Sequence, residues 1–285
     1  MRISVVGVIG SGKTQLINKL KETFDDKINV EMVLEPIDKW VKNGILTLFY
    51  SNPIKYAFLF QTTIYNDLVD QTELYAECIK YYANILTPFS EFVDKKIKEV
   101  LELKIPIDII APSHGVIWRD NPIQIIEKYI LWSNSYQENQ ITIMYDSMWN
   151  GTRKMAEYIA RGIREADDKV NVKLFKTSST DKNDIITEIF KSKVVLVGSP
   201  TVNKGILTSI AAIMEEIKGM SFKNKKAAAF GCYGWSGEST KVINGLLEEA
   251  GFSIINDGIR AMWNPDEESL KKCIEFGKEI ATGVQ

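Results

Sequence analysis

The residues from Gly7 to Thr14 read GVIGSGKT, a complete G-x-x-x-x-G-K-[ST] phosphate-binding motif. A short apolar run predicts a strand before the motif, and apolar residues at helical spacing follow it, which is the context the motif requires. In such a loop backbone N–H groups surround phosphate oxygens, Lys13 would reach the terminal phosphates, and the Thr14 hydroxyl would hold Mg²⁺. The expected phosphate-binding residues are Gly7, Gly10, Ser11, Gly12, Lys13 and Thr14.

A carboxylate, Glu35, follows the second apolar stretch, Val30 to Leu34, and precedes Pro36. A carboxylate that follows a second strand would face the phosphate-binding motif at the end of the first strand, where it could act as a general base. The same residue could be a surface carboxylate before a turn. From its own pattern, the surface position is the better interpretation.

Three turns near the end of the chain carry small, hydroxyl and aromatic residues directly after predicted strands. They are the first loop (residues 146–152), the second loop (residues 198–205) and the third loop (residues 231–237). In an open parallel sheet, ligands bind beyond the carboxyl ends of the strands. The first loop opens a helix, so its hydroxyls and N–H groups could hold a phosphate monoester. The other two loops could enclose a planar ring against an aromatic side chain.

Any one of these turns taken alone would be an ordinary polar loop, but the three in order favour a ligand site. The candidate residues are Ser147, Met148, Trp149, Asn150, Gly151, Thr152, Ser199, Pro200, Thr201, Val202, Asn203, Gly231, Tyr233, Gly234, Trp235, Ser236 and Gly237. Cys232 also lies in the third loop, where it is expected to be a small buried residue without redox chemistry.

Strands and helices alternate in the last part of the chain, which would place the three loops at one edge of a sheet. The expected strands are Ile141–Tyr145, Val172–Phe175, Val194–Val197, Ala227–Phe230 and Phe252–Ile255. Five strands that alternate with amphipathic helices predict an α/β fold with a doubly wound parallel sheet. Gly251 is expected at a helix C-cap, and Asn264-Pro265-Asp266 would supply the N-cap and first-turn proline of the closing helix.

The preceding part of the chain has a mostly helical pattern. Apolar and aromatic residues at helical spacing run from Trp40 to about Tyr65 and are interrupted by Asn52-Pro53. A long helical pattern follows from about residue 66 to residue 100. Ile107–Ala111 predicts a short strand, and Pro122–Trp132 predicts a helix with Pro122 in its first turn.

Composition limits the classes of function. The length of 285 residues indicates about two domains, and the 35 basic and 37 acidic residues nearly balance. This near-neutral charge balance does not indicate binding to nucleic acid or to a membrane surface. The single histidine, His114, and the scattered cysteines Cys78, Cys232 and Cys273 exclude the usual multi-His or Cys-cluster metal sites within one chain. Without a targeting or membrane-spanning segment, the expected location is the cytoplasm.

The segments GVIGSGKT, EPIDKW, NGILTLFYSNP and FLFQT, which fall between Met1 and about Tyr65, resemble the start of a deoxynucleoside kinase. The resemblance implies binding of ATP with Mg²⁺, a role for Glu35 at the sugar 5′-hydroxyl, and a nucleoside pocket that includes Trp40 and Gln61. After about residue 65 the further strands, the arginine motif and the arginine-rich lid of such kinases are missing. A working kinase is therefore not expected.

From Asn66 to Ala281 the chain resembles the carboxyl-terminal part of a flavodiiron protein. The segments that carry the resemblance are VDQTELYAECIKYYANILTPFS, IIAPSHGVIWRDNP, ITIMYDSMWNGTRKMA, VLVGSPTVN and AAAFGCYGWSGES. The resemblance implies a flavodoxin-like domain that binds FMN through the three loops. Gly151 and Glu238 depart from the residues common at their positions, which could weaken FMN binding without abolishing it.

Flavodiiron proteins also hold a di-iron centre in a metallo-β-lactamase-like domain, and His114 matches the last iron ligand. Because the kinase-like start replaces the stretch that supplies the other ligands, the di-iron centre is predicted absent and His114 vestigial. The expected division is a deoxynucleoside-kinase-like fragment (1–65), a metallo-β-lactamase-like remnant (66–138) and a flavodoxin-like domain (139–285).

The sequence therefore predicts an FMN-binding, flavodoxin-like electron-transfer protein that lacks NO or O₂ reduction. The resemblance implies a flavin reductase or rubredoxin-type electron donor, and a homo-oligomer remains open. The alternative is an ATP-binding, deoxynucleoside-kinase-like phosphotransferase that uses Lys13, Thr14 and Glu35.

Overall fold

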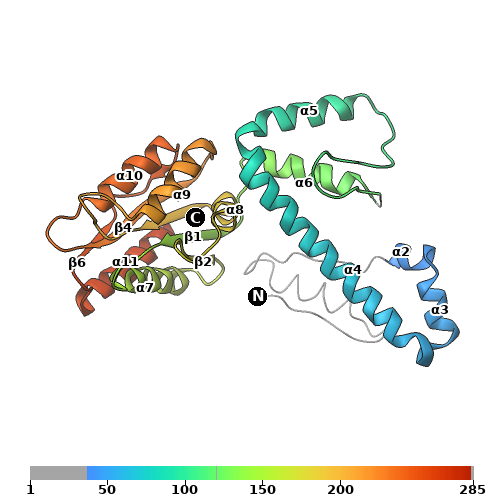
Figure 1. Ribbon diagram of the computed structural model, residues 1–285, viewed down its shortest axis with the longest axis horizontal. Helices are drawn as coiled ribbons and strands as arrows, with labels where there is room; N and C mark the ends of the chain where they lie inside the picture. The colour runs from blue at the N-terminus through green and yellow to red at the C-terminus, as the bar shows by residue number, and fades with distance from the viewer. Residues whose placement is uncertain (1–36, 120, 284–285) are drawn as a thin grey trace. The chain divides into compact units, whose positions relative to one another are not determined.

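A computed structural model describes residues 37–119 and 121–283 of the chain (Figure 1). The predicted phosphate-binding motif Gly7–Thr14 and Glu35 lie outside the described residues. The backbone of Gln61 is described as helical, without its side chain. The chain divides into two compact units, residues 1–79 and residues 80–285, and each is treated by itself below.

The described part of the first unit is helical. Helix α2 (Ile37–Lys42) and helix α3 (Ile45–Ser51) precede helix α4 (Pro53–Tyr81), and the expected interruption at Asn52-Pro53 is confirmed. Trp40, Ile45 and Phe60 form a small core, in which the Trp40 and Phe60 rings meet edge to face with centroids 5.6 Å apart. Residue 65, where the sequence resemblance changes, lies inside α4.

The second unit begins with a helical segment that contains short irregular turns. A π-helical turn (η1, Tyr82–Leu86) and a 3₁₀ turn (η2, Thr87–Phe89) separate α4 from helix α5 (Ser90–Glu102). Helix α6 (Ile123–Ser133) follows after an irregular stretch. The long helical pattern predicted to about residue 100 is thus present, but it is divided at residues 82–89, where Pro88 cannot donate a helical hydrogen bond.

The predicted strand Ile107–Ala111 is also wrong, because this stretch forms only one antiparallel bridge, between Ile110 and Trp118. Its two backbone hydrogen bonds are 3.0 and 2.8 Å long. Proline residues flank the stretch at positions 106 and 112, and a proline has no N–H for a ladder.

A six-stranded parallel sheet forms the centre of the second unit, in the order β2-β1-β3-β4-β5, with β6 also paired to β4. The strands are β1 (Gln140–Tyr145), β2 (Asn171–Lys176), β3 (Val194–Gly198), β4 (Lys226–Tyr233), β5 (Ser253–Ile254) and β6 (Ile259–Met262). All five expected strands are present, although the fifth is shorter than expected. The sixth was not predicted, and it occupies the same sheet edge as β5, farther along β4.

Helices cover both faces of this sheet (Figure 1). They are α7 (Gly151–Ala166), α8 (Lys182–Lys191), α9 (Thr208–Gly219), α10 (Ser239–Glu249) and α11 (Glu267–Thr282). Helices α7 and α11 lie against each other on one face, while α8, α9 and α10 lie on the other. The main core contains fully buried residues from β1, β3, β4, α7 and α11, such as Ile143, Leu196 and Ile159.

The ends of two helices test the capping predictions. Gly251 follows α10 with φ +86°, and the Phe252 N–H closes the end on the Leu247 carbonyl at 3.0 Å, so the predicted glycine stop is confirmed. The N-cap of α11 is Asp266, whose carboxylate accepts from the Ser269 N–H at 2.8 Å. The expectation that Asn264 caps this helix with Pro265 in its first turn is wrong, because Pro265 precedes the cap.

Helix α6 differs from its prediction in the same way. Pro122 occupies the N-cap position, one residue before the first turn. A proline in this position still gives up no helical hydrogen bond, because the first N–H groups of a helix have no partner within it.

Candidate functional site

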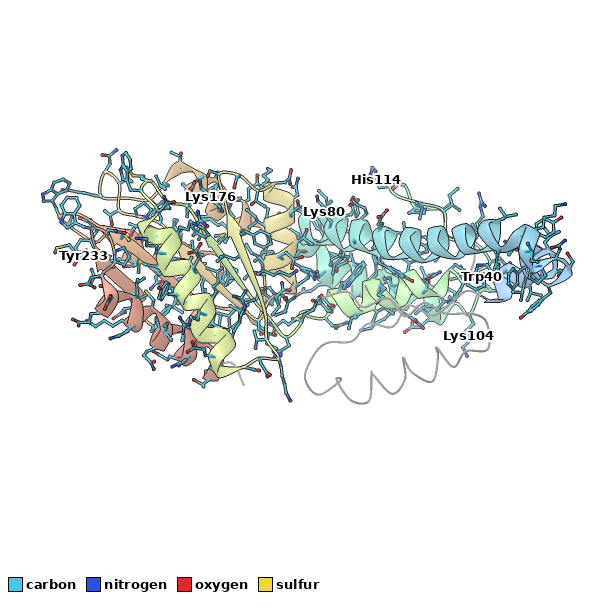
Figure 2. All side chains as sticks on the ribbon, turned by 90° about the horizontal axis from the view of Figure 1, so that it is seen from below. Trp40, Lys80, Lys104, His114, Lys176 and Tyr233 are labelled. Atoms are coloured by element: carbon cyan, nitrogen blue, oxygen red, sulfur yellow. The ribbon has the colours of Figure 1, made fainter. Side chains whose placement is uncertain are left out.

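The three loops gather at the carboxyl edge of the sheet because they follow β1, β3 and β4, which are neighbours in it. Tyr233 is the last residue of β4 (Figure 2), so residues 231–233 of the third loop are the end of this strand. Backbone and side-chain bonds connect the loops: the Thr201 N–H donates to the Cys232 carbonyl at 2.8 Å, and the Ser239 N–H donates to the Thr201 hydroxyl at 3.1 Å. The structure therefore brings the sequence-predicted residues of all three loops together.

The first loop ends in an open helix terminus. Asn150 is the N-cap of α7 with φ +63° and makes no side-chain cap bond, whereas Asp181 and Asp266 cap α8 and α11 through their carboxylates. The first turn of α7 carries no acidic residue. Its N–H groups have no partner within the helix, so this terminus can accept an anion.

Thr152, in the first turn of α7, supplies a further donor. This residue is 1% exposed, and its hydroxyl makes no hydrogen bond of regular geometry among the described residues, although it lies close to the Cys232 thiol. A thiol is a weak hydrogen-bond partner, so the hydroxyl keeps a donor that an anion at the helix terminus could engage.

The side chains of the second loop mainly hold the loop itself. Ser199 is fully buried, and its hydroxyl accepts from the Leu207 N–H at 3.0 Å. Val202 and Gly205 exchange two backbone hydrogen bonds across a tight turn whose two central residues have positive φ. These internal bonds fix the loop backbone at the edge of the sheet and use the N–H groups of Ser199, Thr201 and Val202 within the protein.

Large aromatic side chains are exposed around the same edge. Trp149 in the first loop is 87% exposed and Trp235 in the third loop is 89% exposed. Trp263, from the loop between β6 and α11, packs edge to face against Trp235 with the ring centroids 5.0 Å apart. These large, exposed rings lie beside the polar loops, where they could enclose a planar ligand.

Asp146 and Trp263 are two residues of this edge that the sequence did not single out. Asp146 is 6% exposed, and its carboxylate accepts hydrogen bonds from the Ser147 N–H at 2.8 Å and from the Ser178 hydroxyl at 3.1 Å. The sequence pattern that could have pointed to Asp146 is a carboxylate at the first position of the first loop. The pattern around Trp263 was weaker, because strand β6, which precedes it, was not predicted.

Cys232 is buried between the sheet and α7, as predicted. Its sulfur lies 3.5 Å from that of Met155, and burial raises the pKa of the Cys232 thiol to about 11. The thiol is therefore protonated at neutral pH and is a poor nucleophile. The Cys232 side chain also limits which residue fits at position 151, because a Cβ on Gly151 would lie 2.9 Å from the Cys232 sulfur.

The remaining predicted residues lie elsewhere. Trp40 is 2% exposed in the core of the first unit. His114 is an exposed residue of the stretch between α5 and α6, with its ring centroid 5.8 Å from that of Tyr81 (Figure 2). Among the described residues, no three His, Cys, Asp or Glu side chains are grouped to hold a metal ion. The absence of a di-iron centre from the whole chain stays a prediction.

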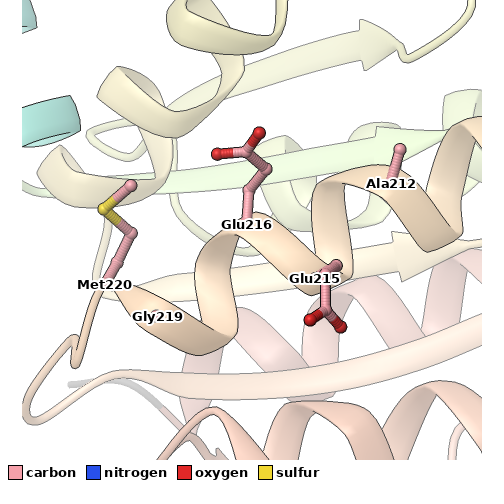
Figure 3. A pocket seen from close by; sticks show the side chains of 5 residues that line it. All are labelled: Ala212, Glu215, Glu216, Gly219 and Met220. Atoms are coloured by element: carbon pink, nitrogen blue, oxygen red, sulfur yellow. The ribbon is translucent and has the colours of Figure 1, made fainter.

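A shallow pocket lies away from the loops, along the second half of α9 (Figure 3). It is lined by Ala212, Glu215, Glu216, Gly219 and Met220. Of its two carboxylates, that of Glu216 is paired with Lys182. Within the described ranges, no helix has the length and apolar character needed to span a membrane.

Two family models match the chain. The flavodoxin family matches residues 143–277, and the deoxynucleoside kinase family matches residues 3–97. The part of the chain from β1 to α11 is therefore a flavodoxin-like α/β domain, in agreement with the predicted fold class. The kinase match extends beyond residue 65, the expected end of the kinase-like part.

Relatives extend the similarity beyond this domain. The anaerobic nitric oxide reductase flavorubredoxin of Escherichia coli strain K12 is 51% identical over 218 residues, which are 76% of this chain and 45% of that protein. The rubredoxin oxygen:oxidoreductase of Desulfovibrio gigas superposes with a TM-score of 0.69 at 34% identity, over 72% of this chain and 51% of that one. The flavodiiron protein of Giardia intestinalis also has a TM-score of 0.69, at 27% identity, over 76% of this chain and 53% of that one.

The chain thus spans about half the length of the relatives it matches. The flavodoxin match and the identity to flavorubredoxin support an FMN-binding, electron-transfer function for the shared part.

Proposed function

We propose that the flavodoxin-like domain binds FMN non-covalently at the three loops and that the protein transfers electrons through it. The observation that carries this proposal is the uncapped start of α7 beside the buried Thr152 hydroxyl, which makes no hydrogen bond of regular geometry. A phosphate monoester satisfies both features at once, because its oxygens accept hydrogen bonds and its negative charge is stabilised at a helix N-terminus. Bound FMN would supply one- and two-electron redox chemistry.

The chain's own residues bind and orient the cofactor in this proposal. The N–H groups of the first turn of α7 and the Thr152 hydroxyl would hold the phosphate. The second loop, fixed by its internal bonds, and the aromatic residues Trp149, Tyr233 and Trp235 would enclose the ring and exclude water from it. The candidate residues of the three loops, as named from the sequence, form this proposed site.

The experiment is to purify the full chain, record its visible absorption, and titrate the apo-protein with FMN. We expect a flavin spectrum, FMN released on denaturation, and saturable rebinding. A colourless protein that takes up no added FMN would overturn the proposal. Riboflavin, which lacks the phosphate, is the matched control and should bind much more weakly if the α7 terminus holds the phosphate.

The proposed electron donor is a flavin reductase or a rubredoxin-type protein. The oxidoreductase of D. gigas, which superposes on this chain, is named for rubredoxin. The test is the rate at which each donor, reduced beforehand, bleaches the bound flavin under anaerobic conditions. We expect one donor to bleach it, and bleaching by neither at rates above that of free FMN would exclude both.

Terminal reduction of NO or O₂ at iron is proposed to be absent. Relatives carry the name nitric oxide reductase, but this chain has His114 as its single histidine. Iron-dependent NO reduction by the purified chain at a rate well above its flavin-only rate would contradict this proposal.

A second candidate function rests on the deoxynucleoside kinase match over residues 3–97. Lys13 and Thr14 would bind ATP with Mg²⁺, Glu35 would act on the substrate hydroxyl, and Trp40 and Gln61 would contact a nucleoside. Transfer of phosphate from ATP to a deoxynucleoside, lost in Lys13→Ala, would establish this function.

We infer that the chain is divided at about residues 65 and 138, with the flavin function in residues 139–285.

A further inference from the structure

We propose that Trp263 is a positioning residue for the flavin, and that it sets the orientation of the Trp235 ring in the third loop. This inference rests on the proposed FMN function. Trp263 lies outside the three loops, in the connection between β6 and α11. It nevertheless contacts the third loop and lies near the start of α7, and its own backbone is held in a strained conformation.

The strain is local and specific. Trp263 has φ +52°, in the left-handed region that bulky side chains rarely adopt. Its N–H donates to the Tyr233 carbonyl at 2.6 Å, which holds the start of the α11 connection against the end of β4. Strain of this kind persists where the surroundings fix the residue, and it is concentrated at ligand sites.

The Trp263 ring packs directly on the backbone of the third loop. A Cβ on Gly234 would lie 2.9 Å from the ring, so a larger residue at position 234 would displace the indole. The Trp263 carbonyl lies 3.4 Å from the position that a Cβ on Gly151 would take, so the residue also lies near the start of α7. Trp263 is therefore placed between the proposed phosphate site and the proposed ring site.

The contact with Trp235 orients an otherwise unsupported side chain. Trp235 is 89% exposed and Trp263 is 58% exposed, so burial of apolar surface does not explain why the two rings meet. Their planes are 73° apart, the edge-to-face geometry that aromatic pairs favour. Fixing the ring before FMN arrives lowers the entropic cost of ordering it on binding.

Three variants of the full chain test the inference. Trp263→Gly removes the ring and also relieves the backbone strain, because glycine adopts positive φ freely. Trp263→Phe keeps an aromatic ring at the same place. Met262→Ala is the matched control, since Met262 is the adjacent residue and is 56% exposed. Each variant is titrated with FMN, its two one-electron potentials are measured, and its apo-form is followed by urea unfolding and far-ultraviolet circular dichroism.

We expect the apo-form of Trp263→Gly to be at least as stable as the wild type, while its dissociation constant for FMN rises about 2- to 10-fold, the range that one aromatic pair supports. Its potentials should shift, and Trp263→Phe should recover most of the affinity. The exciton signal of the paired indoles should disappear from the apo-protein of both Trp263 variants and persist in Met262→Ala.

The outcomes separate this inference from the proposed function. If the wild type binds FMN and Trp263→Gly binds it with the same affinity and potentials, the inference is wrong and the proposed function stands. If Trp263→Gly loses apo-protein stability and FMN affinity by similar amounts, Trp263 has a structural role only, and the inference is also overturned. If the wild type binds no FMN, the proposed function fails and the inference fails with it.

Discussion

The carboxylate of Asp146, at the end of β1, accepts a hydrogen bond from the hydroxyl of Ser209 in the first turn of α9. The same carboxylate accepts from Ser178, beyond β2, at 3.1 Å and from the Ser147 N–H at 2.8 Å. One buried side chain thus connects the first loop to segments that follow β2 and β3. The polar edge of the sheet depends on this residue for its shape.

Asp146→Ala should therefore destabilise the apo-protein by about 2 to 3 kcal/mol, because it removes a buried, charged acceptor of three hydrogen bonds. Ser178→Ala and Ser209→Ala each remove one donor only and should cost about 1 kcal/mol. Urea unfolding of the apo-protein measures all three. A cost for Asp146→Ala no greater than that of either serine variant would show that the carboxylate does not connect the loops.

Thr152→Val should affect stability and FMN binding in opposite directions. The change replaces a buried hydroxyl that makes no hydrogen bond of regular geometry with a methyl group of similar shape, so the apo-protein should gain up to about 1 kcal/mol. FMN affinity should fall about 10- to 100-fold, the range for one hydrogen bond to a charged group. Thermal unfolding of the apo-protein and a fluorescence titration with FMN measure the two effects.

Thr142→Val is the matched control for that variant. Thr142 is also fully buried, but its hydroxyl is bonded to the Ser192 hydroxyl at 2.8 Å. It should therefore lose stability and retain FMN affinity. If Thr152→Val behaves like Thr142→Val, the Thr152 hydroxyl is not a phosphate donor.

Gly151→Ala should be destabilising by about 1 to 3 kcal/mol, because its Cβ would lie 2.9 Å from the Cys232 sulfur in a packed interior. Cys232→Ala removes that sulfur, so the double variant should lose less stability than the sum of the single variants. Urea unfolding of the four proteins gives the coupling energy. Gly245→Ala, in α10 with open space at the Cβ position, is the control and should be stabilising by up to about 1 kcal/mol. Additive effects at Gly151 and Cys232 would refute the packing argument.

How far the sequence predicts this fold depends on how local each signal is. The strands β1 and β3 are fully buried. β3 is a continuous apolar run and β1 is mostly apolar, so both are visible in the sequence without any partner. Strand β6 has four residues of mixed burial and exists because Phe230–Tyr233 of β4 pairs with it, a relationship that no local pattern contains. Similarly, the loop residues follow from the strand ends, whereas the contacts of Asp146 depend on segments far away in sequence.

Lys225 is a buried lysine at the start of β4, opposite the proposed flavin edge. It is 3% exposed, and its ammonium group donates to the carbonyls of Phe190 and Ser192 at 2.7 Å each, at the end of α8. The Phe190 and Phe222 rings lie 6.0 and 5.6 Å from its nitrogen. Burial lowers the pKa of Lys225 to about 7, although the carbonyls and the ring faces favour its charged form.

This lowered pKa gives folding a pH dependence with a definite sign. Between pH 7 and about 10.4, the usual lysine pKa, the unfolded chain holds a proton on Lys225 that the folded chain has released. Because the unfolded state then binds more protons, the contribution of Lys225 to stability rises with pH through this window, by up to about 4 kcal/mol. The stability of the wild type minus that of Lys225→Met should therefore increase from pH 7 to pH 10. The adjacent, exposed Lys226 is the control, and the same difference for Lys226→Met should stay flat. Urea unfolding at several pH values measures both differences, and parallel curves for the wild type and Lys225→Met would show that the buried amine keeps its proton throughout.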